Sequence, residues 1–280
     1  RPGLYRHVLV LDFKSLYPSI IRTFNIDPLG LVLASDPVLP EEASVPGFRG
    51  VRFAREGHIL PDLIEQLWAQ RDAAKQAADA PLSQAIKIIM NAFYGVLGSP
   101  GCRFFDPRLA ASITLRGHEI LNRTKDRIEA AGHTVIYGDT DSVFVWIEEA
   151  QDDAAAEAAG RELEATLNAW WRETLRAEYA VESRLELEFE THYRRFLMPT
   201  VRGSEKGSKK RYAGLVDDGA GGERLVFKGL ENVRSDWTRL ARQVQEELYG
   251  RIFRDEPWQD WLRAEVAAVR AGERDEQLVY

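Results

Sequence analysis

The segment VIYGDTDSVFVW, residues 135–146, constrains the fold more than any other part of the chain, because two apolar runs flank one short polar turn. Apolar residues alternate on both sides, and Gly138 with the Asp-Thr-Asp group supplies turn-forming residues. The pattern predicts a β-hairpin with Asp139 and Asp141 at its tip. Asp is common in tight turns for local reasons, so this hairpin alone indicates no function.

A second strand is predicted over residues 7–13, HVLVLDF, a nearly continuous apolar run that ends at Asp12. In the following KSLYPSIIRTF, Pro18 fits the first position of a helix. The amides near Leu16 and Tyr17 would then lie at a helix N-terminus, where phosphate binds readily. Residues 27–58 are rich in Pro and Gly and predict a loop or irregular β structure.

A helical hairpin is predicted over residues 61–79 and 81–98, because a proline begins each of two amphipathic segments. Polar residues three or four positions apart share one face of a helix. The faces identified in this way carry Arg71, Lys75, Lys87, Asn91 and Tyr94. Without context, such faces are usually only solvated.

The remaining segments complete an α+β pattern. They predict a helix over 109–131 that ends at Gly132, further helix through the acidic segment and 167–180, and an alternating strand over 185–193. A second hairpin is predicted over 211–216 and 224–229, followed by two helices over 235–253 and 257–272.

The charges are segregated along the chain. Lys and Arg number 37 and Asp and Glu 44, so the net charge is −7, which taken alone argues against a nucleic-acid partner. Acidic residues gather in 148–165, however, and basic residues in 201–214. A local positive surface can therefore exist on an acidic chain.

Several classes of protein are excluded. The single cysteine, Cys102, excludes an internal disulfide framework, and the five histidines do not occur at the spacing of zinc ligands, so we expect any metal to be held by oxygen. No apolar run approaches the roughly 18 residues of a membrane span, and no signal peptide is evident. We expect a cytosolic protein without a membrane partner. A chain that begins with Arg close to a strand suggests a piece of a longer protein.

The carboxylates would form a single site if the strand ending at Asp12 lies beside the hairpin that carries Asp139 and Asp141. Carboxylates from distant parts of the sequence would then meet at one edge of a sheet. Mg²⁺ prefers oxygen ligands and completes its shell with water and substrate phosphate, so this arrangement suits it better than zinc. Two such ions about 4 Å apart can support phosphoryl transfer. The basic helical hairpin would clamp a triphosphate.

Four segments, DFKSLYPSII, KIIMNAFYGVLGS, YGDTDS and KKRY, occur in this order and resemble the successive polymerase motifs of family-B DNA polymerases. Each is modest alone, whereas the ordered set is highly specific. The segments DFKSLYPSIIRTFNIDPLG, GSKKRYAGL and VFKGLENVRSDWT are similar to the bacterial DNA polymerase II branch. The resemblance covers nearly the whole chain.

The resemblance implies template-directed DNA synthesis by two-metal-ion nucleotidyl transfer from a dNTP to a primer 3′-OH. It implies two Mg²⁺ ions, for which Mn²⁺ can substitute. The implied partners are primer-template DNA and dNTP, with a sliding clamp as a further partner of the parent enzyme. The implied location is the bacterial cytosol, at the nucleoid.

The resemblance also assigns roles to individual residues. Tyr17 matches the residue that stacks under the sugar and blocks a 2′-hydroxyl, which is discrimination by steric exclusion. The catalytic carboxylates are Asp12, Asp139 and Asp141, and the metal ligands are Asp12, Asp141 and the backbone carbonyl of Phe13. The nucleotide-binding residues are Ser15, Leu16, Tyr17, Arg71, Lys87, Asn91 and Tyr94. The DNA-binding residues are Gly95, Lys209, Lys210, Arg211, Tyr212 and Lys228.

The implied architecture is a right hand. A palm of antiparallel sheet with packed helices would comprise residues 1–58 and 99–227, a helical-hairpin fingers region residues 59–98, and the start of a helical thumb residues 228–280. The family's 3′–5′ exonuclease and N-terminal regions have no counterpart in the chain, and the thumb is expected to stop early.

Two alternatives to polymerase activity are a metal-dependent nuclease and a catalytically inert scaffold. A metal-dependent nuclease would share the carboxylate pair but needs neither the face carrying Lys87, Asn91 and Tyr94 nor Tyr17. A catalytically inert palm-fold scaffold would be expected to have lost carboxylates, whereas this chain retains all three. Three further acids, Glu186, Glu188 and Glu190, alternate along one strand and are expected to form a solvated face; the alternative is that one of them approaches the metals.

Overall fold

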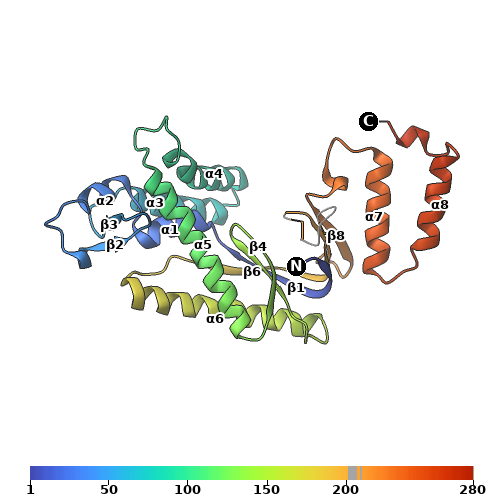
Figure 1. Ribbon diagram of the computed structural model, residues 1–280, viewed down its shortest axis with the longest axis horizontal. Coiled ribbons are helices and arrows are strands. Elements are labelled where there is room, and N and C mark those ends of the chain that lie inside the picture. Colours follow the sequence, from blue (N-terminus) through green and yellow to red (C-terminus); the bar gives the residue numbers. More distant parts are fainter. Residues whose placement is uncertain (201–206, 209, 280) are drawn as a thin grey trace.

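An antiparallel six-stranded sheet lies at the centre of the protein, with the strand order β4-β5-β1-β6-β7-β8 (Figure 1). The structure, a computed structural model, describes residues 1–200, 207–208 and 210–279. The strands of this sheet are β1 (Gly3–Phe13), β4 (Thr134–Asp139), β5 (Ser142–Trp146), β6 (Leu187–Met198), β7 (Tyr212–Asp217) and β8 (Glu223–Lys228). A separate hairpin pairs β2 (Ser44–Pro46) with β3 (Arg52–Ala54).

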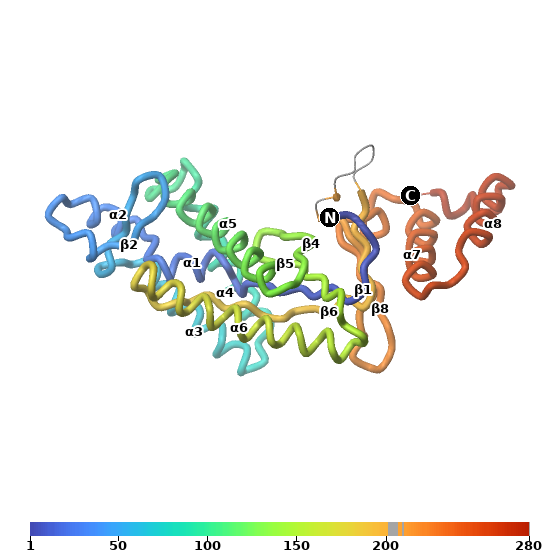
Figure 2. The backbone as a smooth tube through the Cα atoms, turned by 60° about the horizontal axis from the view of Figure 1, so that its bottom comes forward, coloured from blue at the N-terminus to red at the C-terminus, as the bar shows by residue number. Residues whose placement is uncertain are grey.

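The helices form two groups at opposite ends of an elongated molecule (Figures 1 and 2). The first group comprises α1 (Leu16–Phe24), α2 (Pro28–Leu33), α3 (Leu60–Gln76), α4 (Ala80–Leu97), α5 (Pro107–Ala130) and α6 (Asp153–Tyr179). The second group comprises α7 (Arg239–Phe253) and α8 (Gln259–Arg270). Helices α5 and α6 of the first group run alongside the sheet and pack on it, whereas α7 and α8 lie beyond its far end.

Strand β1 organises the core because both of its faces are buried. Leu9 and Leu11 face the larger hydrophobic cluster, whereas Val8 and Val10 belong to a second cluster with residues of β5 and β6. Successive side chains of a strand point to opposite faces, so this division follows directly from the run HVLVLDF. The run thus predicted a strand that is central to the sheet.

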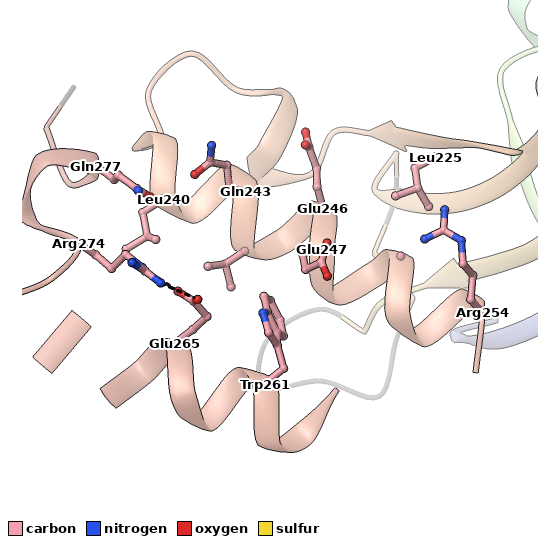
Figure 3. Close-up of a pocket in the computed structure, with 12 residues that line it drawn as sticks. Leu225, Leu240, Gln243, Glu246, Glu247, Arg254, Trp261, Glu265, Arg274 and Gln277 are labelled. Carbon is pink, nitrogen blue, oxygen red and sulfur yellow. Dashed lines mark hydrogen bonds and ion pairs between the residues drawn. The ribbon is translucent and has the colours of Figure 1, made fainter. Parts of the chain in front are cut away.

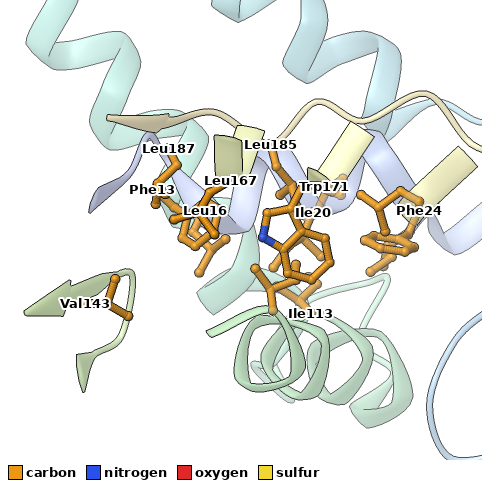
Figure 4. Close-up of a cluster of buried hydrophobic side chains, with 14 of the residues drawn as sticks. Phe13, Leu16, Ile20, Phe24, Ile113, Val143, Leu167, Trp171, Leu185 and Leu187 are labelled. Carbon is orange, nitrogen blue, oxygen red and sulfur yellow. The ribbon is translucent and has the colours of Figure 1, made fainter. Parts of the chain in front are cut away.

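The larger cluster joins α1, α5 and α6 to the sheet (Figure 4). Trp171 of α6 is 2% exposed and donates a hydrogen bond from Nε1 to Thr124 Oγ1 of α5 at 3.0 Å. Burying an indole in this way satisfies its one donor while removing a large apolar surface from water. This packing fixes α5 and α6 beneath β1, and hence fixes the position at which β1 ends.

The predicted elements are confirmed, with two corrections. Helix α1 begins at Leu16, so Pro18 occupies its third position rather than its first. Proline is tolerated there because the first four helical amides have no intrahelical partner. Helix α2 lies within the segment predicted as loop or irregular β structure. The side chain of Asp27 caps it by accepting a hydrogen bond from Gly30 N at 2.7 Å, and Pro28 begins it.

Candidate active site

Asp12, on β1, and Asp141, in the turn immediately before β5, lie close together at one edge of the sheet, as the sequence predicted. Strand β1 pairs with β5 so that Asp12 is opposite Ser142, whose hydroxyl donates a hydrogen bond to Asp12 Oδ1 at 2.5 Å. The amide of Phe13 donates to the carbonyl of Asp141 at 2.8 Å. The hairpin formed by β4 and β5 has Thr140 at its tip in a left-handed conformation, with φ 43°. Backbone pairing therefore brings together two carboxylates that are 129 positions apart in the sequence.

The carboxylates repel one another electrostatically and are partly desolvated. Burial, together with the charges of Asp141, Glu190 and Glu188, raises the pKa of Asp12 to about 6, although the Ser142 hydroxyl opposes the shift. Burial also raises the pKa of Asp141, with further contributions from Asp139 and Glu190. Within the described residues, neither Asp12 nor Asp141 forms an ion pair with a basic side chain. A divalent cation would relieve this excess of negative charge.

Glu190 reaches the site through a β-bulge that sequence reasoning did not detect. The register between β1 and β6 shifts between Val10 and Leu11, which leaves Glu190 as the extra residue. A bulge commonly redirects a side chain in this way. Glu186, Glu188 and Glu190 are exposed, as predicted, and Lys14 Nζ contacts Glu186 and Glu188 at 2.9 and 2.6 Å. The solvated face is confirmed, but its charge acts on the aspartates.

The start of α1 adds a tyrosine and free backbone amides beside the carboxylates. Ser15 is the N-cap in a left-handed conformation (φ 47°), and the amides of Leu16 and Tyr17 belong to the first turn. The ring of Tyr17 packs against Tyr94 of α4 with centroids 4.8 Å apart. Burial raises the pKa of Tyr17, and the charges of Tyr94 and Asp141 contribute. Tyr17 therefore links the carboxylate edge to α4.

A cavity of about 440 Å³ lies beside Tyr17, between α5 and the β4–β5 hairpin. Gly117 of α5 forms part of its wall, and a Cβ at this position would lie 3.3 Å from Tyr17 Cε1. The absence of a side chain at Gly117 lets the tyrosine ring lie against the helix. The other polar residues along this wall are His118, Asn122 and Lys125.

Helices α3 and α4 form the predicted helical hairpin. Ile86 and Met90 of α4 are buried, whereas Lys87 and Asn91 are exposed on another face. Neither polar side chain has a hydrogen-bond or ion-pair partner among the residues that the structure describes, and neither is seen to contact the aspartates. On α3, Arg71 Nε is buried and has no hydrogen-bond partner among the described residues. These groups remain available to a ligand.

The predicted DNA-contacting segment meets the hairpin through Lys210. Its ammonium lies 3.2 Å from Asp139 Oδ1, and its backbone amide donates to the Tyr137 hydroxyl at 2.9 Å. Arg211 forms an ion pair with Glu231. Lys209, which the sequence placed in the same contact, lies outside the described residues. The basic segment is thus anchored next to the carboxylate turn, a contact that no sequence pattern indicated.

Tyr212 is used mainly for packing. Its ring contacts Phe144, Tyr193 and Phe196, and burial raises its pKa to about 12. Lys228 is exposed and lies opposite Tyr212 in the β7–β8 ladder. Gly95 is exposed on α4, where a Cβ would meet open space.

The chain was compared with known proteins and structures. Residues 1–277 match the family described as DNA polymerase family B. DNA polymerase II of Escherichia coli (strain K12) is 59% identical over 280 residues, which are 100% of this chain and 35% of that protein. The DNA polymerase of Thermococcus gorgonarius is 30% identical over 265 residues, 90% of this chain and 31% of that protein.

A solved structure, that of the family B DNA polymerase from the hyperthermophilic archaeon Pyrobaculum calidifontis, superposes with a TM-score of 0.63 at 29% identity. It covers 97% of this chain, and this chain covers 32% of it. The chain thus spans about a third of the length of the relatives it matches. Among the described residues no helix is both long and apolar enough to cross a membrane. Because the family match extends over almost every residue and the polymerase fold is reproduced, this chain belongs to DNA polymerase family B.

Proposed function

We propose that this chain performs template-directed DNA synthesis, transferring a nucleotide from a dNTP to the 3′-OH of a primer. The observation that carries the proposal is the pairing of β1 with β5, which brings Asp12 beside Asp141 in the turn before β5, close to the Tyr17–Tyr94 contact. Two carboxylates alone would suit many metal-dependent reactions. A partly buried aromatic pair at the same edge adds a surface against which a sugar and a base can lie.

The carboxylate edge suits two Mg²⁺ ions, held by Asp12, Asp141 and the backbone carbonyl of Phe13. The donors are hard oxygens, and the pKa values of both aspartates are raised mainly by burial and further by neighbouring negative charges that no basic side chain of the described residues balances. When bound, the two ions supply activation of the attacking hydroxyl and stabilisation of the leaving group. Mn²⁺ accepts the same ligands and can substitute. Asp139, which is paired with Lys210, has a lesser part.

The nucleotide would lie between α1 and α4. The helix-start amides near Ser15, Leu16 and Tyr17 would bind phosphate, and Tyr17 would exclude a 2′-hydroxyl. From the helical hairpin, Arg71, Lys87 and Asn91 would hold the triphosphate through charge-assisted hydrogen bonds. Support comes from the unsatisfied Arg71 Nε and the exposed polar face of α4. Tyr94 and Gly95 would line the new base pair.

Primer-template DNA would contact Lys210, Arg211, Tyr212 and Lys228, with Lys209 beyond the described residues. The corresponding division of the chain is a palm over 1–58 and 99–227, fingers over 59–98 and part of a thumb over 228–280. The net charge of −7 is compatible with this proposal because phosphate contacts depend on local basic groups. A sliding clamp is a further partner to test with the parent enzyme.

The test is extension of a labelled primer on a defined template with dNTPs and Mg²⁺. We expect extension by the unmodified chain, loss of at least a hundredfold in Asp141→Asn, and no loss in Asp260→Asn. Asp260 is a suitable control because its side chain is 95% exposed on α8. Extension that survives in Asp141→Asn would contradict the proposed site.

A chimeric protein distinguishes a loss of catalytic activity from a loss of DNA binding. The matching segment of Escherichia coli DNA polymerase II would be replaced by this chain, which is 59% identical to it. Activity in the chimera but not in the chain alone would show that this chain carries the catalytic residues. It would also show that other regions of the polymerase supply the affinity for primer-template DNA that the chain alone lacks. Inactivity in both would favour an inert scaffold. Degradation of primer without synthesis would favour a nuclease.

A further inference from the structure

A second group of metal-ligating side chains lies near the start of β1, five residues before Asp12 on the same strand. His7 Nδ1 is 3.1 Å from His192 Nε2 and 3.7 Å from Asp153 Oδ1. The ligand atoms of these three residues all lie within 4.8 Å of one another, and no other such group occurs in the described part of the chain. We propose that His7, Asp153 and His192 bind a transition-metal ion, Zn²⁺ in the first instance, at a site separate from the catalytic carboxylates.

The ligand set determines the class of ion. Two imidazoles and one carboxylate suit Zn²⁺, Co²⁺ or Ni²⁺, whereas Mg²⁺ prefers oxygen alone. Tetrahedral Zn²⁺ with bonds of roughly 2.0–2.1 Å requires ligand atoms about 3.3 Å apart. The His7–His192 and His7–Asp153 separations of 3.1 and 3.7 Å bracket this value, whereas His192 and Asp153 lie within 4.8 Å of each other, so the Asp153 side chain would have to turn toward His192 to close the site. The fourth position would be left to water.

One neighbouring charged group holds Asp153, and another lies near His192. Arg194 Nε lies 2.7 Å from Asp153 Oδ2, which leaves Oδ1 directed at the imidazoles. Glu157 Oε1 lies 4.0 Å from His192 Nδ1, the ring nitrogen that does not face His7. This distance is beyond hydrogen-bond range, so an outer-shell hydrogen bond that fixes the ring's orientation and tautomer would form only if the Glu157 side chain moved closer when a metal bound. Asp153 and Glu157 are four positions apart on α6, so they face the same side of the helix.

The backbone supports a functional reading. His7 has φ +51°, a left-handed conformation that is uncommon for a residue other than glycine, in a position where no β-ladder pair forms. Such strain often marks a functional position. The side chains of His7 and His192 are 15% and 9% exposed, and that of Asp153 is 40% exposed, so an ion can enter from solvent.

The site would join three elements that are distant in the sequence. His7 belongs to β1, Asp153 begins α6, and His192 belongs to β6. An ion bound only by the folded chain stabilises it by mass action, so its effect would appear as thermal stability rather than as a step of the reaction. The alternative is a simple hydrogen bond between the two imidazoles, with no affinity for metal.

The test uses chelator-treated chain without an affinity tag, titrated with Zn²⁺ in the presence of excess Mg²⁺. We expect one Zn²⁺ per chain by calorimetry and a rise in Tm on Zn²⁺ addition. His192→Asn and His7→Asn should each lower Zn²⁺ affinity by at least tenfold, and Glu157→Gln by about tenfold. His133→Asn, which changes a histidine outside the group, and Asp141→Asn, which disables the carboxylate edge, should bind as the unmodified chain does.

Equal Zn²⁺ affinity in the unmodified chain and in a folded His192→Asn would overturn the proposal, as would loss of binding in Asp141→Asn. If the histidine variants fail to fold, a crystal structure of the unmodified chain with Zn²⁺ still tests the proposed site. Crystals soaked in Zn²⁺ should give an anomalous peak between His7 Nδ1, His192 Nε2 and Asp153 Oδ1. A peak confined to Asp12 and Asp141, or no peak, would contradict the site.

Discussion

Tyr17 is the side chain whose proposed role is easiest to isolate. Its ring packs on Tyr94 at 4.8 Å and borders the cavity beside α5. We expect Tyr17→Ala to raise ribonucleotide insertion relative to deoxynucleotide insertion by about tenfold or more, because the space opened can accept a 2′-hydroxyl. Tyr17→Phe keeps the ring and should keep the discrimination. Single-nucleotide insertion kinetics with matched dNTP and rNTP measure both, and unchanged selectivity in Tyr17→Ala would remove Tyr17 from this role.

Lys87 tests the triphosphate contact. The side chain is exposed and has no ion-pair partner among the described residues, so removing it should cost little stability. We expect Lys87→Ala to lower kcat/KM for dNTP by roughly tenfold or more, as expected for a lost hydrogen bond to a charged group. Primer-template affinity should remain unchanged. Gln84→Ala, an exposed change on the same helix, is the control for both measurements. A large loss of DNA affinity in Lys87→Ala would instead assign the lysine to DNA.

Asp12 makes stability depend on pH. Its folded pKa of about 6 lies above the ordinary value of 3.8, so the carboxylate destabilises the folded chain fully above pH 6, and the penalty disappears as pH falls to about 4. In a chelating buffer, Asp12→Asn should raise Tm by a few degrees at pH 7.5 and by less at pH 5. Asn keeps an oxygen that can accept the Ser142 hydroxyl. Thermal unfolding at both pH values checks this, with Asp260→Asn as control. An equal gain at both pH values would contradict the assigned cause.

The sequence indicated the site in two steps: Asp12 and Asp141 would meet at one edge of a sheet if their strand and hairpin were neighbours, and the family resemblance added Tyr17. Sequence reasoning could not place Glu190, since the bulge that redirects this side chain depends on register with β1. It also kept His7 and His192 apart, because they are 185 positions distant and meet only through strand pairing. Contacts set by register, rather than by periodicity, are what the sequence left out.

The loop before β7 is held against β8 by a glycine. Gly229 has φ +61°, and a Cβ there would lie 2.2 Å from the carbonyl oxygen of Lys210. Gly219, in the β7–β8 turn, also has a left-handed conformation (φ +79°), but a Cβ there would meet open space. Gly219→Ala therefore carries only the backbone cost of about 1–2 kcal/mol. Gly229→Ala adds a clash with backbone, which cannot move aside as the end of a flexible side chain can.

We therefore expect Gly229→Ala to lower the free energy of unfolding by at least about 1 kcal/mol more than Gly219→Ala. It should also weaken primer-template binding, because the displaced segment carries Lys210 and its contact with Asp139. Chemical denaturation and fluorescence anisotropy with labelled DNA measure the two effects. Equal stability of the two variants would show that the close approach at Gly229 is not maintained in solution.

At the level of elements, long periodic segments were predicted well and short ones were not. The α3–α4 pair and the β4–β5 and β7–β8 hairpins follow from patterns of apolar residues that repeat over many positions. Helix α2 has six residues and no such repeat, so only its cap at Asp27 and Pro28 could have indicated it. The same side chain, Asp27, also accepts hydrogen bonds from Ile59 and Leu60 at 3.1 and 2.7 Å. Tertiary contacts of this kind stabilise what local propensity does not.

Across the chain, stability should be distributed unevenly between the two helical groups. Helix α5 contributes nine buried residues, whereas α8 contributes none. A cavity of about 580 Å³ separates α7 from α8, and its walls include Glu246, Glu265 and Trp261 (Figure 3). Arg251 of α7 lies 5.0 Å from the Trp261 ring centroid and is one of the side chains that connect the two helices. Few buried apolar contacts imply a small free energy for local opening.

Hydrogen exchange measured by mass spectrometry should therefore show α8 losing protection first. We expect its amides to exchange at least about tenfold faster than those of α5, with α7 intermediate because Leu240 and Phe253 are buried. A chain ending at Glu256 should keep the Tm of the full chain, since α8 contributes no buried residue. If α8 exchanged together with α5, or if its removal lowered Tm, the two helical groups would form one cooperative unit. In that case contacts across the cavity would have to be stronger than the Arg251–Trp261 stack implies.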